Sequence, residues 1–432
     1  MHSKKHLSFS ALRKLVSNRV IQFEDTRQES KIEYSLHDCC LSALAMMFFQ
    51  DPSLNAFQQR LQEKQQLNNL KTMFNVSAIP KSTQLRTSID NIASTEIEAL
   101  FSDFFHPVQR IKQLELFEFL DNQYLIPIDG VQYFSSDNIS CDCCLTKTKN
   151  KTTSYYHQVV AAAIVCPGIK QVIPLSPEPI QNIDGSTKQD CEINAGKRIL
   201  HKIRATHPKL KIIITGDDLF SNQPFINEIK LNRMSYILVA KPTNHILLYQ
   251  WFSEFHQMGE TQKLKIIDLK GYVHLYEWVN DIPLNGTKDA DNVNYFEYTI
   301  LKDNKVNFHC SWVTDILITE DNIVQLVKAG RARWKIENEA FNTLKNQGYH
   351  LEHNFGHGER HLAYNLLLFN FLAFFMHQIF ELSDLLYQKC RGKFTSRKEF
   401  WNQLRCTIRI LIFPSFESLL KFIIDPESGI PP

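Results

Sequence analysis

The spacing of apolar residues changes along the chain and divides it into segments of different structure. Up to about residue 120 the apolar positions follow helical spacing, with an apolar stretch of helical length at 36–49. Short apolar runs typical of strands then take over, interrupted by two helical stretches. We expect strands at 124–134, 154–166, 169–175, 211–216 and 235–240, and helices at 187–207 and 223–232. This order predicts an α/β fold with a mixed sheet, in which three strands precede the first crossover helix.

Later segments differ again. Residues 246–318 contain long β-branched and aromatic runs broken by turn residues at Asn285-Gly286 and Asp303-Asn304, which predict a β-rich insertion. Residues 320–346 have helical spacing. The expected organisation is a helical region at 1–120, an α/β core in two parts at 121–245 and 319–385, the insertion at 246–318, and a basic helical region at 386–432.

Residues 362–380 form an apolar run about as long as a membrane span. Asn365, Asn370, His377 and Gln378 interrupt it, and charged residues precede it. We therefore expect a buried core helix and no membrane partner.

Composition indicates a soluble globular protein, because 44% of residues are hydrophobic and 22% are charged. The net charge is only +2, so a nucleic-acid partner has to be argued from local basic patches. The first 20 residues lack the apolar stretch of a signal sequence. The ten cysteines show no pairing pattern of a small secreted domain, so we expect a cytoplasmic protein with reduced thiols.

Three acidic residues stand out as candidates for chemistry. Asp129 follows the apolar run Leu125-Ile-Pro-Ile, Asp217 follows three isoleucines and Thr-Gly, and Glu337 lies on the later helix. A carboxylate at the end of an apolar strand is costly to bury unless it binds a cation or donors, and ligands of open α/β sheets sit where strands end. Each aspartate alone also fits a turn residue that caps a loop. Asp218 competes with Asp217, and Glu339 competes with Glu337 from about 200° around the helix.

These three residues in this order, with Arg333-x-x-x-Glu337 and a following Lys345, resemble the DDE transposases of bacterial insertion sequences. Members with a β-rich insertion before the glutamate are most similar. The resemblance covers roughly residues 120–360, and the N-terminal third is similar to the family's helical DNA-binding region. It implies a ribonuclease H-like mixed sheet with flanking helices, and two Mg²⁺ or Mn²⁺ ions held by Asp129, Asp217 and Glu337.

The resemblance also implies the reaction and the partners. Water cleaves the phosphodiester at the transposon end, and the freed 3′ hydroxyl then attacks target DNA. Asp129, Asp217, Glu337, Arg333 and Lys345 would be the catalytic residues. The partners would be double-stranded transposon ends and target DNA, bound by a homo-oligomer in a bacterial cytoplasm, at the nucleoid when on DNA. Two alternatives remain: a metal-dependent nuclease on the same core without strand transfer, and a catalytically inactive DNA-binding relative.

The chain departs from the family pattern at three places. Gly330 stands where a tyrosine is expected, Lys345 follows Glu337 by eight residues and not seven, and Leu219-Phe220 replaces the frequent Gly-Tyr after the second aspartate. These departures affect the roles of the tyrosine and the lysine more than the three carboxylates.

DNA contacts are expected from two basic segments. Near a helix entry at 80–86, Gln84, Arg86 and the more distant Arg60 could reach DNA. A second run could follow phosphates, although a solvated basic face explains it equally well. Its basic residues are Lys389, Arg391, Lys393, Arg397, Lys398, Arg405 and Arg409, with Glu399 as the single acid.

Other side chains that could bind a metal are expected to have ordinary structural roles. Cys141-x-Cys143-Cys144 offers half a zinc site, but no second Cys-x-x-Cys follows and the nearby candidates are His157, Cys166 and Cys191. We expect reduced loop thiols and no structural zinc. His350, His353, His357 and His361 cluster in sequence, but Gly356 and Gly358 break any helix that would align them, so we expect polar loop residues. Glu192, close to the start of the first crossover helix, fits a charged first turn facing the helix dipole.

Overall fold

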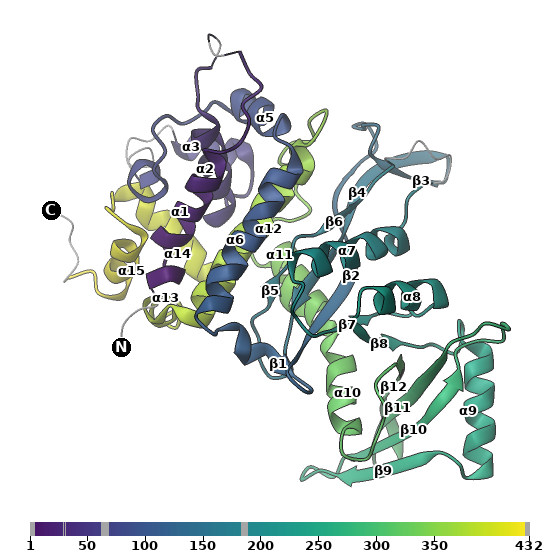
Figure 1. The fold of residues 1–432 in the computed structure, drawn as a ribbon. Helices are drawn as coiled ribbons and strands as arrows, with labels where there is room; N and C mark the ends of the chain where they lie inside the picture. Colours follow the sequence, from purple (N-terminus) through teal and green to yellow (C-terminus); the bar gives the residue numbers. More distant parts are fainter. Residues whose placement is uncertain (1–4, 29, 31, 62–68, 183–188, 428–432) are drawn as a thin grey trace.

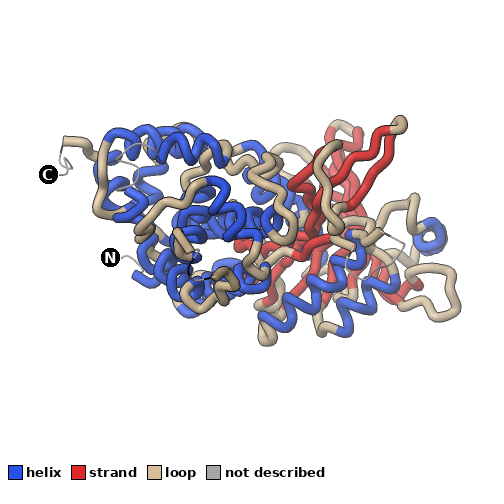
Figure 2. The backbone as a smooth tube through the Cα atoms, turned by 90° about the horizontal axis from the view of Figure 1, so that it is seen from above, coloured by secondary structure: helices blue, strands red, loops and turns tan. Residues whose placement is uncertain are grey.

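The computed structural model describes residues 5–427 apart from residues 29, 31, 62–68 and 183–188. Figure 1 shows a helical body that contains both ends of the chain and, beside it, a twisted sheet with its own helices. Seen from above, the strands gather on one side of the molecule and helices make up most of the other side (Figure 2).

The N-terminal segment of the chain contributes helices to this body, as the apolar spacing predicts. Ser35 caps α2 by accepting a hydrogen bond from the Asp38 amide at 3.0 Å. The α-helices are α1 (Phe9–Val20), α2 (Leu36–Phe48), α3 (Leu54–Leu61), α5 (Ser82–Asp90) and α6 (Ser94–Arg110). Short 3-10 helices η1 (Lys5–Leu7) and η4 (Leu114–Phe117) and the π-helical segment η3 (Leu70–Phe74) accompany them.

The C-terminal helices return to this body. They are α12 (Leu362–Ser383), α13 (Leu385–Arg391), α14 (Arg397–Ile410) and α15 (Phe416–Ile424). Helix α12 packs against α2, α5 and α6. The Phe48 ring lies 5.4 Å from Trp401 and 5.2 Å from Phe416, centroid to centroid. Residues more than 350 positions apart in sequence therefore share one aromatic core.

Helix α12 is the one described helix long and apolar enough to cross a membrane by length and composition, and 83% of its most apolar window is buried inside the protein. Two of its polar side chains donate hydrogen bonds inside the protein. The Asn365 amide donates to the carbonyls of Ile89 and Ile92 at 2.9 and 2.8 Å, and that of Asn370 donates to Tyr349 at 2.8 Å. The prediction of a buried core helix is confirmed.

The centre of the sheet contains the predicted strands. β2 (Gln123–Ser136) pairs antiparallel with β4 (Thr152–Ile164) and parallel with β7 (Ile212–Gly216), and β7 pairs parallel with β8 (Ser235–Val239). The expected strand 169–175 is reduced to β5 (Ile173–Pro174). The remaining short strands are β1 (Glu118–Phe119), β3 (Leu145–Lys149) and β6 (Glu178–Ile180).

The β-rich segment extends this same sheet. It begins with a helix, α9 (Ile246–Met258). These residues lie in the predicted β-rich insertion, where no helix was expected. The antiparallel strands β9 (Gln262–Ile267), β10 (Val273–Pro283), β11 (Asn292–Lys302) and β12 (Lys305–Thr314) follow. β12 pairs with β8, so the strand order is β3-β4-β2-β7-β8-β12-β11-β10-β9. The segment is thus joined to the core by main-chain hydrogen bonds.

The helices around the sheet are α7 (Glu192–Thr206), α8 (Gln223–Leu231), α10 (Ile323–Ala332), the π-helical segment η5 (Ile336–Phe341) and α11 (Asn342–Asn346). Helix α7 begins at Glu192, and the expected start at residue 187 lies outside the described residues. The predicted helix 320–346 is present but contains the π segment.

One carboxylate ties the two halves of the helical body together. At the end of α5, the Asp90 carboxylate accepts backbone N–H groups of Glu359, Arg360, His361 and Leu362 at 2.8 to 3.1 Å, at the start of α12. Burial raises the pKa of Asp90, but these four donors outweigh it and hold the pKa below its usual value.

We expect Asp90→Ala to lower the free energy of unfolding by about 1–3 kcal/mol, because four amides at the α12 N-terminus lose their acceptor. Since the folded-state pKa is depressed, this contribution should be full above the unfolded pKa near 3.8 and should fade as pH drops through the folded value. Urea unfolding at pH 7 and pH 3 measures it. Asp289→Ala, on an exposed loop, is the control; equal effects of the two variants would contradict the capping role.

Candidate active site

The strand register brings the two candidate aspartates together. Pro127 pairs with Thr215 in the parallel β2–β7 ladder. Asp129 and Asp217 each lie two residues further along, so they are neighbours on the same side of the sheet. Adjacent strands are about 4.8 Å apart. Asp217 follows the last residue of β7, where the strand has ended and its side chain is half-buried.

Arg333 joins the third candidate to this pair. Its Nη1 donates to Oε1 of Glu337 at 2.7 Å and lies 3.7 Å from Oδ2 of Asp129. The guanidinium is 8% exposed, compared with 19% for the Asp129 side chain and 33% for that of Glu337. One buried cation is therefore shared by carboxylates that are 208 positions apart in the sequence, 337 minus 129.

Glu337 lies in the π-helical segment η5, directly after α10 and the short connection at 333–335. A π turn contains one residue more than an α turn and often occurs at functional sites. Segment η5 contacts β2, which places Glu337 over the strand of Asp129. No feature of the residue pattern indicated this local change of helix type.

The electrostatics of the site show a shortage of positive charge. Burial raises the pKa of Asp129, the Arg333 charge lowers it, and the charges of Glu337 and Asp217 raise it again, to about 7 in total. Only carboxylates close to one another perturb each other in this way. A hard divalent cation, which prefers carboxylate oxygens, would remove the deficit.

Asp218 is committed to the fold. Its carboxylate is buried, accepts the Lys241 amide at 2.7 Å and also accepts the side-chain amide of Asn244. The neighbouring Asp217 carboxylate accepts only a local bond from the Leu219 amide among its described contacts, at 3.0 Å. The arrangement favours Asp217 over Asp218 as the ligand.

Glu192 is a fourth carboxylate at the site, and the sequence analysis assigned it to a charged helix turn. A Cβ on Gly130 would lie 2.5 Å from Cδ of Glu192, so the glycine makes room for this side chain. Burial raises the pKa of Glu192, a hydrogen bond from Gln158 lowers it, and the charge of Asp217 raises it. The Gly130 that follows Asp129 was the available signal, because it indicated close approach of another group.

The three departures from the family pattern have partial explanations. A Cβ on Gly330 would lie 2.6 Å from Nε1 of Trp312, so the indole of β12 occupies the space that a tyrosine would need. Phe220 is fully buried and packs against Phe225, with ring centroids 4.9 Å apart. Lys345 pairs with Glu352 at 2.8 Å, so its amino group is directed to that side chain.

The structure revises the candidate DNA contacts. Arg60 is buried and forms an ion pair with Asp51, which removes it from the surface. Arg397 pairs with Glu381 at 2.8 Å and is only 14% exposed, so it holds helices together and is a poor phosphate ligand. Arg391 and Lys393 donate to carbonyls of Phe394 and Ile424. Arg86, Lys389 and Lys398 are exposed and remain candidates.

Comparisons with known proteins show a distant likeness to solved structures. No protein-family model and no curated protein matches the chain. Among solved structures, the chain is similar to piggyBac transposase in a synaptic complex with hairpin DNA, with 12% sequence identity and a TM-score of 0.44. The match covers 99% of this chain and 86% of that one. At this similarity the chain's own residues have to carry any functional conclusion.

Asp129 and Asp218 should respond oppositely to loss of their side-chain charge. Because the folded-state pKa of Asp129 is raised, metal-free stability should fall as pH rises from about 4 to about 7. We expect Asp129→Asn to stabilise the metal-free protein at pH 8 by a few kcal/mol at most, and to have little effect at pH 4. Thermal unfolding in a chelator at both pH values measures this.

Asp218→Asn is the matched substitution, and it should destabilise the protein at pH 8, because Asp218 accepts the Lys241 amide and the Asn244 side chain. Destabilisation by both substitutions would contradict the charge shortage at Asp129.

Proposed function

We propose that the chain is a DNA transposase of the DDE type, in which Asp129, Asp217 and Glu337 hold divalent metal ions for phosphoryl transfer on DNA. The observation that supports the proposal is the shared guanidinium of Arg333, at 2.7 Å from Glu337 and 3.7 Å from Asp129, together with the raised pKa of Asp129 beside Asp217. Perturbed carboxylates gathered on neighbouring strands of an α/β sheet are typical of functional sites.

The sheet supports the same proposal. An antiparallel group containing β4 and β2 comes first, and β7 and β8 then add in parallel after the crossover helices α7 and α8. This is the arrangement expected for a ribonuclease H-like core. Strands β9–β12 would be the family's β-rich insertion, placed in sequence between Asp217 and Glu337.

The residues fit a pair of Mg²⁺ or Mn²⁺ ions, because the donor set consists of carboxylate oxygens and carries more negative charge than Arg333 balances. When bound, such ions act as Lewis acids that stabilise charge on the attacking and leaving oxygens at phosphorus. Asp129 must lose its proton before it can act as a ligand. Arg333 lowers the pKa of Asp129 and so favours that state near neutral pH.

Segment η5 offers a reason for the unusual lysine spacing. Because a π turn contains an additional residue, the eight positions from Glu337 to Lys345 correspond to seven in an uninterrupted α-helix. Lys345 would then contact DNA after release from Glu352, which is largely exposed. Glu192 would assist Asp217 as a further acidic group on the other side of β2.

The decisive experiment is metal-dependent cleavage of DNA that carries the inverted repeats flanking the coding region. We expect Asp217→Asn and Glu337→Gln each to lose more than about 100-fold in cleavage rate, since even outer-shell partners of a metal cost about 10–100-fold. DNA binding, measured by gel shift, should persist because phosphate contacts come from basic residues elsewhere.

Glu339→Gln is the matched control for Glu337→Gln, because both substitutions lie in η5 and remove one charge. Full activity of the Glu337 variant would exclude Glu337 from the site. Joining of a cleaved 3′ end to target DNA distinguishes a transposase from a nuclease on the same core. Absence of any Mn²⁺-dependent cleavage by the unmodified chain would favour an inactive DNA-binding relative.

Arg333 should set the pH dependence of cleavage. Removing a cation beside a carboxylate raises the pKa of that carboxylate, so Arg333→Ala should move the acidic limb of the pH–rate profile to higher pH, in addition to lowering the rate. Arg331→Ala, an arginine two residues earlier that lies over the Phe308 ring, is the control. An unshifted limb would mean that Asp129 does not titrate in the rate-determining state.

A further inference from the structure

A second cluster of potential metal ligands lies beyond the C-terminal end of β2. One ligand atom from each of Cys141, Cys144, His157 and His357 falls within 4.8 Å of every other. Cys141 and Cys144 come from the β2–β3 loop, His157 from β4, and His357 from the loop before α12. From this geometry we propose that these four residues form a structural zinc site.

The distances within the cluster match the edges of a zinc tetrahedron. Zinc–sulfur and zinc–nitrogen bonds of about 2.3 and 2.0–2.1 Å require edges of about 3.8 Å between sulfurs, 3.6 Å between sulfur and nitrogen and 3.3 Å between nitrogens. The two Sγ atoms are 3.7 Å apart, and the two Nε2 atoms are 3.1 Å apart. Nε2 of His157 is 3.6 Å from Sγ of Cys141 and 3.5 Å from Sγ of Cys144, which is also 3.5 Å from Nε2 of His357.

Groups around the cluster orient the ligands as they do in zinc sites. Nδ1 of His357 lies 2.9 Å from the Gly358 carbonyl, so it carries the proton and leaves the Nε2 lone pair for a metal. The Cys141 amide points to Sγ of Cys144 at 3.4 Å, a donor that suits a thiolate. Two thiols would lose their protons to solvent when zinc binds, and two imidazoles would bind as neutral ligands.

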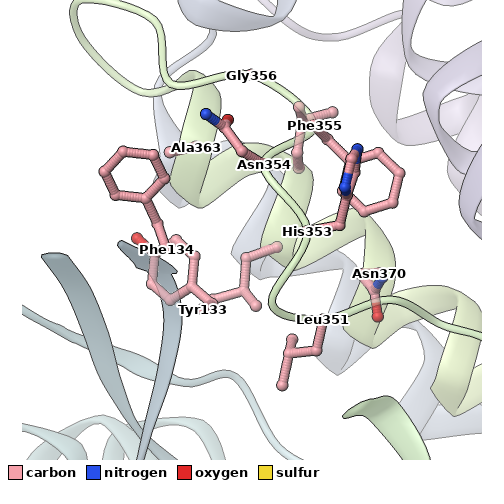
Figure 3. A pocket seen from close by; sticks show the side chains of 11 residues that line it. Tyr133, Phe134, Leu351, His353, Asn354, Phe355, Gly356, Ala363 and Asn370 are labelled. Atoms are coloured by element: carbon pink, nitrogen blue, oxygen red, sulfur yellow. The ribbon is translucent and has the colours of Figure 1, made fainter. Parts of the chain in front are cut away.

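The surroundings favour a closed site. The Phe134 ring lies 4.6 Å from His357 and 5.5 Å from His157, and Tyr133 stacks on His157 at 5.8 Å. Figure 3 shows Tyr133 and Phe134 on their strand, facing the loop that carries Leu351 to Gly356. Four protein ligands in an aromatic setting leave no open position for substrate, which is the character of a structural site.

The proposed zinc would connect three parts of the protein. β2 and β4 belong to the sheet, and the His357 loop continues from the helix of Glu337 into α12. The same loop is held by Asp90 of α5 through four amides. The ion would therefore fix the path of the chain from the candidate active site to the helical body, next to the exposed Arg86.

The test is the metal content of the full chain, purified without chelator and compared with variants. We expect one zinc ion per chain by elemental analysis in the unmodified protein and in Cys143→Ser, whose thiol lies in the same loop outside the four ligands. Cys144→Ser and His357→Gln should lose most of the zinc. Refolding with Co²⁺ should give the visible spectrum of a tetrahedral site with two thiolates in the unmodified protein and in Cys143→Ser only.

Three outcomes would overturn the proposal. The first is a metal-free protein that does not take up Zn²⁺ or Co²⁺ when these are supplied. The second is equal zinc content in Cys143→Ser and Cys144→Ser, with both variants giving the Co²⁺ spectrum of the unmodified protein. The third is a Cys141–Cys144 disulfide in freshly purified protein, detected by mass spectrometry as the loss of two hydrogens. Metal content does not depend on cleavage activity, so failure of the transposase proposal would leave the zinc site unaffected, and the reverse.

Discussion

The candidate active site carries more negative than positive charge, and its electrostatic properties follow from that imbalance. Asp129, Asp217, Glu337 and Glu192 converge on one region, and the Arg333 guanidinium is the cation that the structure places among them. Its burial makes it effective, because a charge away from solvent is less screened. It cannot balance the set alone, which is why the pKa of Asp129 is raised despite it. Such an arrangement lowers stability while no metal is bound, and the proposed divalent cations would offset that cost.

This requirement organises the surrounding fold. The parallel β2–β7 pairing puts two aspartates side by side, and a glycine next to one of them admits Glu192 from the crossover helix. The π segment then brings Glu337 over the strand, where Arg333 from the end of α10 donates to it. Trp312, which comes from the β-rich segment, fills the space over Gly330 and supports the helix that carries Arg333. The extension of the sheet through β12 is therefore part of the support of the site, and not a separate appendage.

The sequence allowed the main strands and the core helix α12 to be predicted and the three candidate carboxylates to be singled out, because each depends on a local pattern. Apolar runs define β2 and β7, and an aspartate at the end of such a run is conspicuous. Pairs made by distant residues were not predictable. From the sequence, Arg397 and Arg60 looked like exposed basic residues. In the fold they form ion pairs with Glu381 and Asp51. Glu192 looked like a helix-turn charge because Gln158, its hydrogen-bond donor, and Asp217, whose charge raises its pKa, lie on other elements.

The proposed zinc ligands were not predictable for the same reason, because they come from distant parts of the sequence. Two thiols and His157 are close in sequence, but the fourth member of the cluster, His357, is 200 residues away from His157. Local spacing therefore presents only half of a metal site. The glycines around His357 exclude a helix that would align metal ligands, but they permit the turn that directs Nε2 inward. Both clusters involve the same long strand or the loop that follows it: β2 carries Asp129, and its far end leads into Cys141. A displacement of β2 would disturb the carboxylates and the thiols together, so an ion at the proposed zinc site would also restrict strand movement at Asp129.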